Sequence, residues 1–183
     1  MKRKLIGIII ILCVAAAVFF IIRGSRGTSV ADPEAAVQET AEEKHPVVYV
    51  NYAGTCLSMD EKGVVISNSS AEPEGIPYIT GMEFTEIVFG KKAVAENMAG
   101  LEYVLRVAAD LEKNGIKADK IVFSSGTVTL VRGELQIKLG RNEKTDSKIK
   151  DLADLLPQVD GKRGVLYMQN GDADNYGYTF REN

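Results

Sequence analysis

The sequence predicts an α+β protein in which a single N-terminal transmembrane helix precedes a mostly antiparallel sheet flanked by two helices. Three observations predict this class. An uncharged apolar segment lies near the N-terminus, short β-branched runs are separated by glycine turns, and two longer stretches repeat apolar residues at helical spacing. We expect four parts, namely a cytoplasmic tail (1–4), a transmembrane helix (5–22), an extracytoplasmic linker (23–45) and a β-domain (46–183).

The apolar segment from Leu5 to Ile22 contains no charged residue. As a helix its 18 residues would be about 27 Å long, enough to cross a thin hydrocarbon core. The bases 2–4 precede it and only Arg23 and Arg26 follow before the acidic linker, so the N-terminus is predicted to be cytoplasmic. The apolar run continues past the small residues 15–17, which favours an uncleaved anchor over a cleavable signal peptide.

Charge and cysteine content narrow the possible functions. The chain has 22 Lys and Arg and 25 Asp and Glu residues, and five of the bases flank the apolar segment, so the exported part has a net charge of −8. This charge disfavours nucleic acid as a partner. Cys13 follows Leu12 where a lipoprotein signal requires a small residue, so we interpret it as an apolar membrane residue. Only Cys56 remains outside the membrane, and no intramolecular disulfide is possible.

The first half of the β-domain is predicted to contain short strands. These strands are Val47–Tyr52, Cys56–Met59, Val64–Ser67 and Phe84–Phe89. Asp60–Gly63 predicts a hairpin turn with Gly63 at positive φ. Asn68–Gly81 contains two prolines and two glycines, so we expect no regular element there.

Two helices are predicted from apolar spacing. Ala93–Asn114 repeats apolar residues at steps of three and four, and Gly115 is placed to end this helix. Asp146 is predicted to cap a second helix over Ser147–Leu156, with Pro157 just beyond its end.

Five further strands are predicted around the second helix. They are Lys120–Ser124, Thr127–Val131, Glu134–Leu139, Gly164–Met168 and Tyr176–Arg181. Short glycine turns separate the first three, which makes them antiparallel neighbours. The last strand follows a polar turn and closes the chain. Because a strand at a chain terminus often lies at a sheet edge, we expect it to leave main-chain N–H and C=O groups unpaired.

Catalytic and metal-binding motifs are incomplete, so we expect no enzyme, cofactor or metal. Ser147–Lys150 matches the Ser-x-x-Lys of penicillin-binding enzymes, but the Ser-x-Asn and Lys-Thr-Gly motifs are absent. Cys56 and His45 lack a third catalytic group, and a buried thiol is the simpler interpretation of Cys56. Asn170–Asn175 alternates oxygen ligands like a calcium loop but lacks its glycine and its bidentate glutamate.

Several pieces of the chain, taken in order, resemble a known family. The pieces are Met59–Val65, Ile76–Gly81, the long helix, Leu135–Gly140, Lys148–Leu156, Gly164–Met168 and the final aromatic strand. Together they resemble the extracytoplasmic β-domain of the bacterial cell-division proteins FtsQ and DivIB, over about 47–181, plus the basic tail and single span. The family's membrane-proximal POTRA domain, of some 70 residues, has no room between Arg23 and Pro46.

The resemblance implies a non-enzymatic scaffold at the division septum that binds FtsB-like or DivIC-like and FtsL-like partners outside the membrane. In such proteins the partner adds a strand to the last strand of the sheet. The corresponding residues are Tyr176, Gly177, Tyr178, Thr179, Phe180 and Arg181. The three aromatics share one strand face and Gly177 would let a backbone approach closely.

Two alternatives remain open. The aromatic residues of the last strand would fill the core if they had no role in binding. Separately, the chain would be a membrane-anchored sensor or ligand-binding module with its pocket beside the loop Asn68–Gly81.

Overall fold

The computed structural model describes residues 44–141, 143–169 and 177–183, which belong to one compact unit, Glu42–Asn183. The predicted cytoplasmic tail, the transmembrane segment and most of the linker lie outside these residues. Within the described ranges, no helix is both long and apolar enough to cross a membrane.

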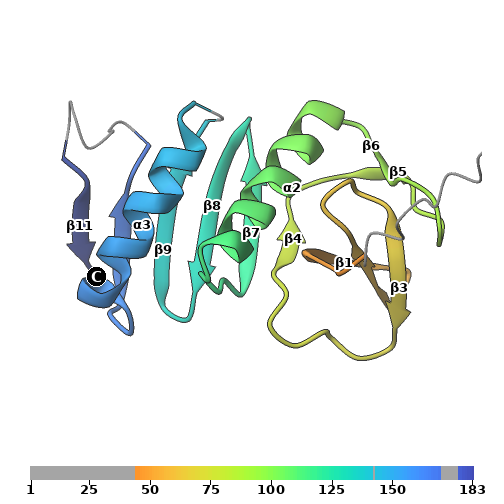
Figure 1. Cartoon of the computed structure of the whole chain (residues 1–183), viewed down its shortest axis with the longest axis horizontal. Helices are drawn as coiled ribbons and strands as arrows, with labels where there is room; N and C mark the ends of the chain where they lie inside the picture. The colour runs from red at the N-terminus through yellow and green to blue at the C-terminus, as the bar shows by residue number, and fades with distance from the viewer. Residues whose placement is uncertain (1–43, 142, 170–176) are drawn as a thin grey trace, which may run out of the picture. The chain divides into compact units, whose positions relative to one another are not determined.

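The described chain forms one large mixed sheet, a small two-stranded ribbon and two helices (Figure 1). The elements are β1 (Val48–Tyr52), β2 (Thr55–Met59), β3 (Val65–Ser69), β4 (Tyr78–Thr80), β5 (Phe84–Glu86), β6 (Val94–Ala95), α2 (Met98–Lys113), β7 (Lys120–Ser124), β8 (Thr127–Arg132), β9 (Leu135–Gly140), α3 (Thr145–Val159), β10 (Gly164–Tyr167) and β11 (Thr179–Glu182). The large sheet has the order β11-β10-β9-β8-β7-β4-β1-β2-β3, and β5 pairs with β6. Five of its eight pairings are antiparallel, which confirms the mostly antiparallel α+β prediction.

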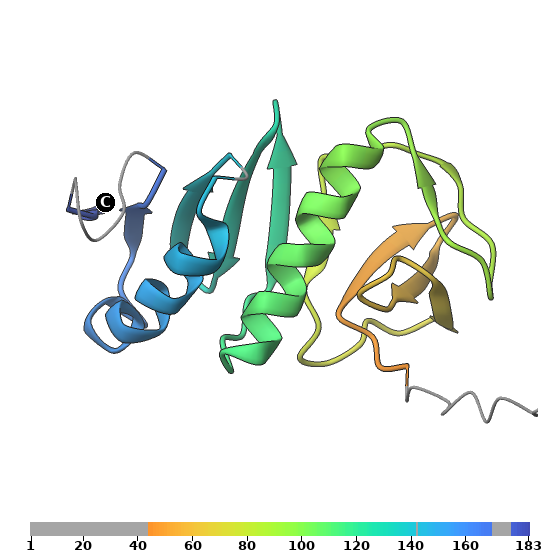
Figure 2. The ribbon, with the colours of Figure 1, turned by 45° about the horizontal axis from the view of Figure 1, so that its top comes forward.

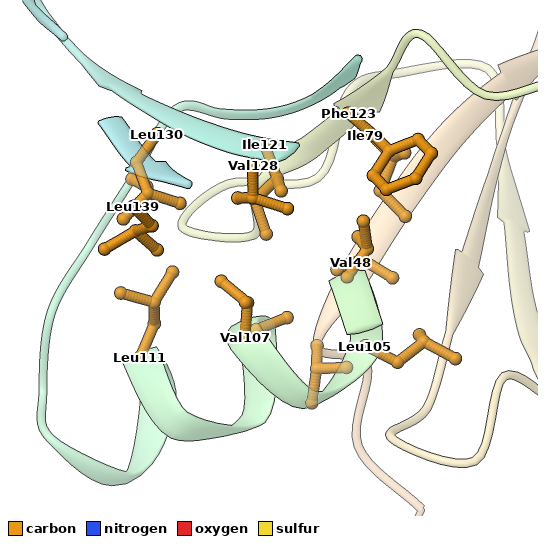
Figure 3. Close-up of a cluster of buried hydrophobic side chains, with 14 of the residues drawn as sticks. Val48, Ile79, Leu105, Val107, Leu111, Ile121, Phe123, Val128, Leu130 and Leu139 are labelled. Atoms are coloured by element: carbon orange, nitrogen blue, oxygen red, sulfur yellow. The ribbon is translucent and has the colours of Figure 1, made fainter. Parts of the chain in front are cut away.

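Both helices cover the same face of the sheet (Figure 2). The helices contact each other, and α2 also contacts β7 while α3 contacts β9. Figure 3 shows Val107 and Leu111 of α2 pointing at strand residues such as Val128, Leu130 and Leu139. Alternate strand residues therefore form a buried layer under the helices, as period-two alternation predicts.

Helix α2 starts later than the sequence predicts. Val94 and Ala95 pair with β5 instead of joining the helix, and Asn97 accepts the N–H of Gly100 at 2.8 Å as the N-cap. The predicted end is confirmed, because Gly115 has φ +67 and the N–H of Ile116 donates back into the last turn. This arrangement is a Schellman motif.

The predicted hairpin turn between β2 and β3 is confirmed. The N–H of Gly63 donates to the carbonyl of Asp60 at 2.9 Å, and Gly63 has φ +79. The Asp60 carboxylate also accepts the N–H groups of Lys62 and Val64, at 3.0 and 2.8 Å. A buried carboxylate therefore satisfies the turn's main-chain donors.

The prediction that Asn68–Gly81 holds no regular element is wrong. β3 extends to Ser69, and Tyr78–Thr80 forms β4 between β1 and β7, parallel to both. The N–H of Tyr49 donates to Pro77 O at 3.1 Å. Main-chain bonds from both sides stabilise this short strand despite the neighbouring prolines and glycines, because tertiary pairing outweighs local propensity.

The predicted limits of α3 are also wrong. The helix spans Thr145–Val159, so Asp146 lies in its first turn and Pro157 lies inside it. Lys144 occupies the N-cap position with φ +53, and its side chain makes no capping hydrogen bond.

Candidate functional site at the C-terminal sheet edge

β11 is the outermost strand at one end of the nine-stranded sheet (Figure 1, dark blue). It pairs antiparallel with β10, with Val165 opposite Arg181 and Tyr167 opposite Thr179. The edge position expected of the last strand is therefore observed. The strand covers Thr179–Glu182, which is shifted from the predicted Tyr176–Arg181, and Tyr176 lies outside the described residues.

The hydrogen bonds of β10 show which of its residues face β11. The N–H of Gly164 donates to Glu134 O at 3.4 Å, and the N–H of Met168 donates to Lys138 O at 2.9 Å. These even-numbered residues therefore direct their main-chain groups to β9. Main-chain direction alternates along a strand, so the odd-numbered residues of β10 face β11.

The same alternation identifies the open groups of β11. The N–H of Asn183 donates to Arg163 O at 3.3 Å, so Asn183 faces β10. Arg181, two residues earlier, faces the same way. Phe180 and Glu182 therefore direct their N–H and C=O groups away from the sheet. Over the described ranges, no other strand or loop pairs with this outer side.

The opposite edge of the sheet, β3, is partly covered by the chain itself. The N–H of Val65 donates to Lys91 O at 2.9 Å, and Val65 O accepts the N–H of Gly90 at 2.8 Å. These bonds satisfy edge groups that would otherwise attract another strand. The fold therefore protects part of one edge, whereas no segment within 44–141, 143–169 or 177–183 pairs with the outer side of β11.

The aromatic side chains of this segment pack against the fold. Tyr178 is half-buried, and its hydroxyl donates to the Asp151 carboxylate of α3 at 2.5 Å. Phe180 is half-buried and lies against Gly164. The structure thus favours the alternative in which these rings fill the space beside α3. The open part of the candidate site is its main chain.

On the other face of β11, Arg181 lies near Lys138 of β9, a pair of cations that the sequence analysis missed. Thr179 and Arg181 are exposed, and the Tyr167 ring centroid lies 5.3 Å from the Arg181 guanidinium carbon and 5.0 Å from Lys138 Nζ. The alternation of β9 places Lys138 on the solvent face, but strand order was needed to bring it next to Tyr167. At Gly177, a Cβ would find no atom within 4 Å.

Among the residues that the structure describes, the other sequence motifs do not come together into a site. Ser147 and Lys150 are exposed at the start of α3. Cys56 is buried, as predicted, while His45 is exposed and its Nε2 lies 3.3 Å from Glu112 Oε2. The described residues contain no cluster of three metal-ligating side chains. The calcium-like turn before β11 falls outside the described ranges.

No family model, curated protein or solved structure matches the chain. The fold and the site define an α+β protein with one large mixed sheet, helices on one face and an open C-terminal edge strand.

Proposed function

We propose that this protein is a membrane-anchored scaffold of the cell-division machinery. It binds FtsB-like or DivIC-like and FtsL-like partners outside the membrane, through a strand that the partner adds to β11. The observation that supports this proposal is the outward direction of the main-chain groups of Phe180 and Glu182 at an open edge. The family resemblance supplies the kind of partner, and the apolar segment Leu5–Ile22 supplies the anchor.

The added strand would contact β11 through its main chain and through side chains on both faces of the sheet. Its main chain would pair with Phe180 and Glu182, which gives affinity without regard to side chains. Its side chains would alternate between the face of Tyr178 and the face of Thr179 and Arg181. Cross-strand neighbours then select the partner sequence.

Glu182→Pro is expected to weaken partner binding by at least about tenfold, because proline removes one of the outward N–H donors. The pairing of β11 with β10 does not use this donor. Binding is measured with the full-length chain, as pull-down of the co-expressed FtsB-like or DivIC-like protein and as dissociation constants of the purified pair.

Glu61→Pro is the matched control. Glu61 is exposed and follows Asp60 in the β2–β3 turn, a position that accepts proline. The Glu61→Pro variant has the same glutamate-to-proline change at the far end of the sheet, and its partner binding should match that of the wild type. Equal affinities for Glu182→Pro and wild type, with circular dichroism unchanged, would refute strand addition at β11.

A pocket beside the loop favours the second candidate function, a sensor or ligand-binding module. The pocket has a volume of about 170 Å³ and is lined by residues from the β3–β4 loop, including Gly75, Ile76 and Pro77, and by the end of α2. Pockets for drug-sized ligands usually exceed about 300 Å³, so only a small ligand would fit.

The sensor function predicts that a small cell-wall fragment raises the Tm of the full chain. Ile76→Trp should fill the pocket and remove that shift, whereas Glu182→Pro should leave it intact. A fragment screen by thermal shift checks this prediction, and a screen without any stabilising fragment counts against the sensor function.

A further inference from the structure

The sheet face opposite the helices is covered at one end and open at the other. Near β1 and β2 the chain covers it, because Tyr49, Cys56 and Ser58 are only 6%, 4% and 3% exposed. The pKa of Tyr49 is raised by burial and by the nearby Glu72 carboxylate of the β3–β4 loop. From β7 to β11 the residues of this face are half-buried or exposed, and no described segment lies over them.

Strand register arranges the open part of this face in two adjacent rows. One row consists of Lys120, Val131, Gln136, Val165 and Arg181. The other row consists of Val122, Thr129, Lys138, Tyr167 and Thr179. We call these ten residues the basic sheet face.

The two rows contain three cations and no acid, although the chain as a whole is acidic. The cations lie on every second strand of this part of the sheet, with Lys120 on β7, Lys138 on β9 and Arg181 on β11. Since neighbouring strands lie about 4.8 Å apart, successive cations are about 10 Å apart across the strands, and Lys138 is displaced by two residues, about 7 Å, along the strand direction. Among the described residues, none of the three forms an ion pair with a carboxylate, and Lys138 and Arg181 lie over the Tyr167 ring.

We propose that the basic sheet face binds an extended acidic segment of a partner protein, laid across the strands. A segment in the polyproline II conformation has three residues per turn and advances about 3.1 Å per residue, so carboxylates at every third position lie on one side about 9 Å apart, close to the spacing of the cations across the strands. Such a segment bends with the twist of the sheet, which a straight helix laid across the strands cannot do. Val131, Val165 and Tyr167 lie between the cations and provide apolar contacts.

This surface is distinct from the proposed strand-addition site. Strand addition uses the outward main chain of Phe180 and Glu182, whereas the basic sheet face uses side chains of β7 to β11. Both surfaces include residues of β11, so one partner could occupy them in succession along its chain. The two proposals nevertheless fail separately, because Glu182→Pro removes no side chain of the basic sheet face.

The probe for this proposal is a ten-residue peptide with glutamate at every third position and alanine or valine between. Its control carries glutamine in place of glutamate. Full-length protein in a nonionic detergent is acetylated at lysine with and without each peptide, and mass spectrometry follows individual sites. The glutamate peptide is expected to slow acetylation of Lys120 and Lys138 by about fivefold. Lys150, exposed on α3 at the helix-covered face, is expected to react at an unchanged rate.

Charge reversal provides the second measurement. Lys138→Glu is expected to weaken binding of the glutamate peptide by about fivefold or more, whereas the matched Lys150→Glu is expected to leave it unchanged. The proposal is overturned if the glutamine peptide protects equally, or if Lys150 is protected as strongly as Lys138. It is also overturned if polyphosphate or phosphatidylglycerol vesicles protect these lysines and the glutamate peptide does not, because the face would then select phosphate groups.

Discussion

Gly81→Ala is expected to lower the free energy of unfolding by about 3 kcal/mol, a large share of the stability of an ordinary domain. Gly81 follows β4 and has φ +76, which alanine adopts only with strain. A Cβ there would also lie within 2.1 Å of the carbonyl oxygen of Phe123 on β7. The methyl group would therefore push β4 away from β7 in the middle of the sheet. Urea denaturation of the purified protein measures the effect.

Gly75→Ala separates the cost of a positive φ from the cost of the steric clash with β7. Gly75 has φ +74, but a Cβ there would have no neighbour within 4 Å. Its expected loss is about 1 kcal/mol, the cost of the positive φ alone. If both variants lose the same stability, the close approach of β4 and β7 is not what requires glycine at position 81.

Gly164→Ala is expected to detach β11 from β10. An added Cβ would lie 2.3 Å from the Arg181 carbonyl oxygen and 2.9 Å from the Phe180 ring. Because β11 ends the sheet and, among the described strands, pairs with β10 alone, it can yield without opening the core. We expect amide exchange at Val165 and Arg181 to speed up by at least about tenfold, or about 1.4 kcal/mol.

Gly177→Ala is the matched control for hydrogen exchange. Gly177 lies just before β11, and its Cβ would meet no atom within 4 Å. Protection of β11 should therefore match wild type. If Gly164→Ala also keeps full protection, β11 is held more firmly than its contacts indicate. If it loses protection and still binds the partner normally, strand addition at β11 is wrong.

Local patterns predicted the elements whose residues interact mainly with near neighbours. The spacing of Leu101, Leu105 and Ala108 indicated α2, and glycines indicated the turns after it and between β2 and β3. β4 was missed because its three residues carry too little pattern and its stability comes from β1 and β7. The parallel pairing of β9 with β10 also depends on distant contacts.

The candidate site was predictable in position but not in detail. A closing strand pointed to a sheet edge, and β11 lies there. The spacing of Tyr178 and Phe180 showed that they share a face, yet only the packed fold shows that this face is the one beside α3. Which main-chain groups point outward depends on the register with β10. The placement of Lys120, Lys138 and Arg181 on one sheet face, two strands apart, depends on strand order, which separate sequence windows do not contain.

The short central strand has a mechanical consequence. β4 joins β1 through a single register pair, Tyr49 with Tyr78. The part of the sheet formed by β1–β3 is therefore connected to the part formed by β7–β11 through few main-chain hydrogen bonds. Helix α2 contacts both parts of the sheet, since Leu105 reaches the β2–β3 turn at Gly63 while Val107 packs over β7 and β8 (Figure 3). A pulling force applied to β11 would therefore be transmitted to β1–β3 largely through the packing of α2, as well as through β4.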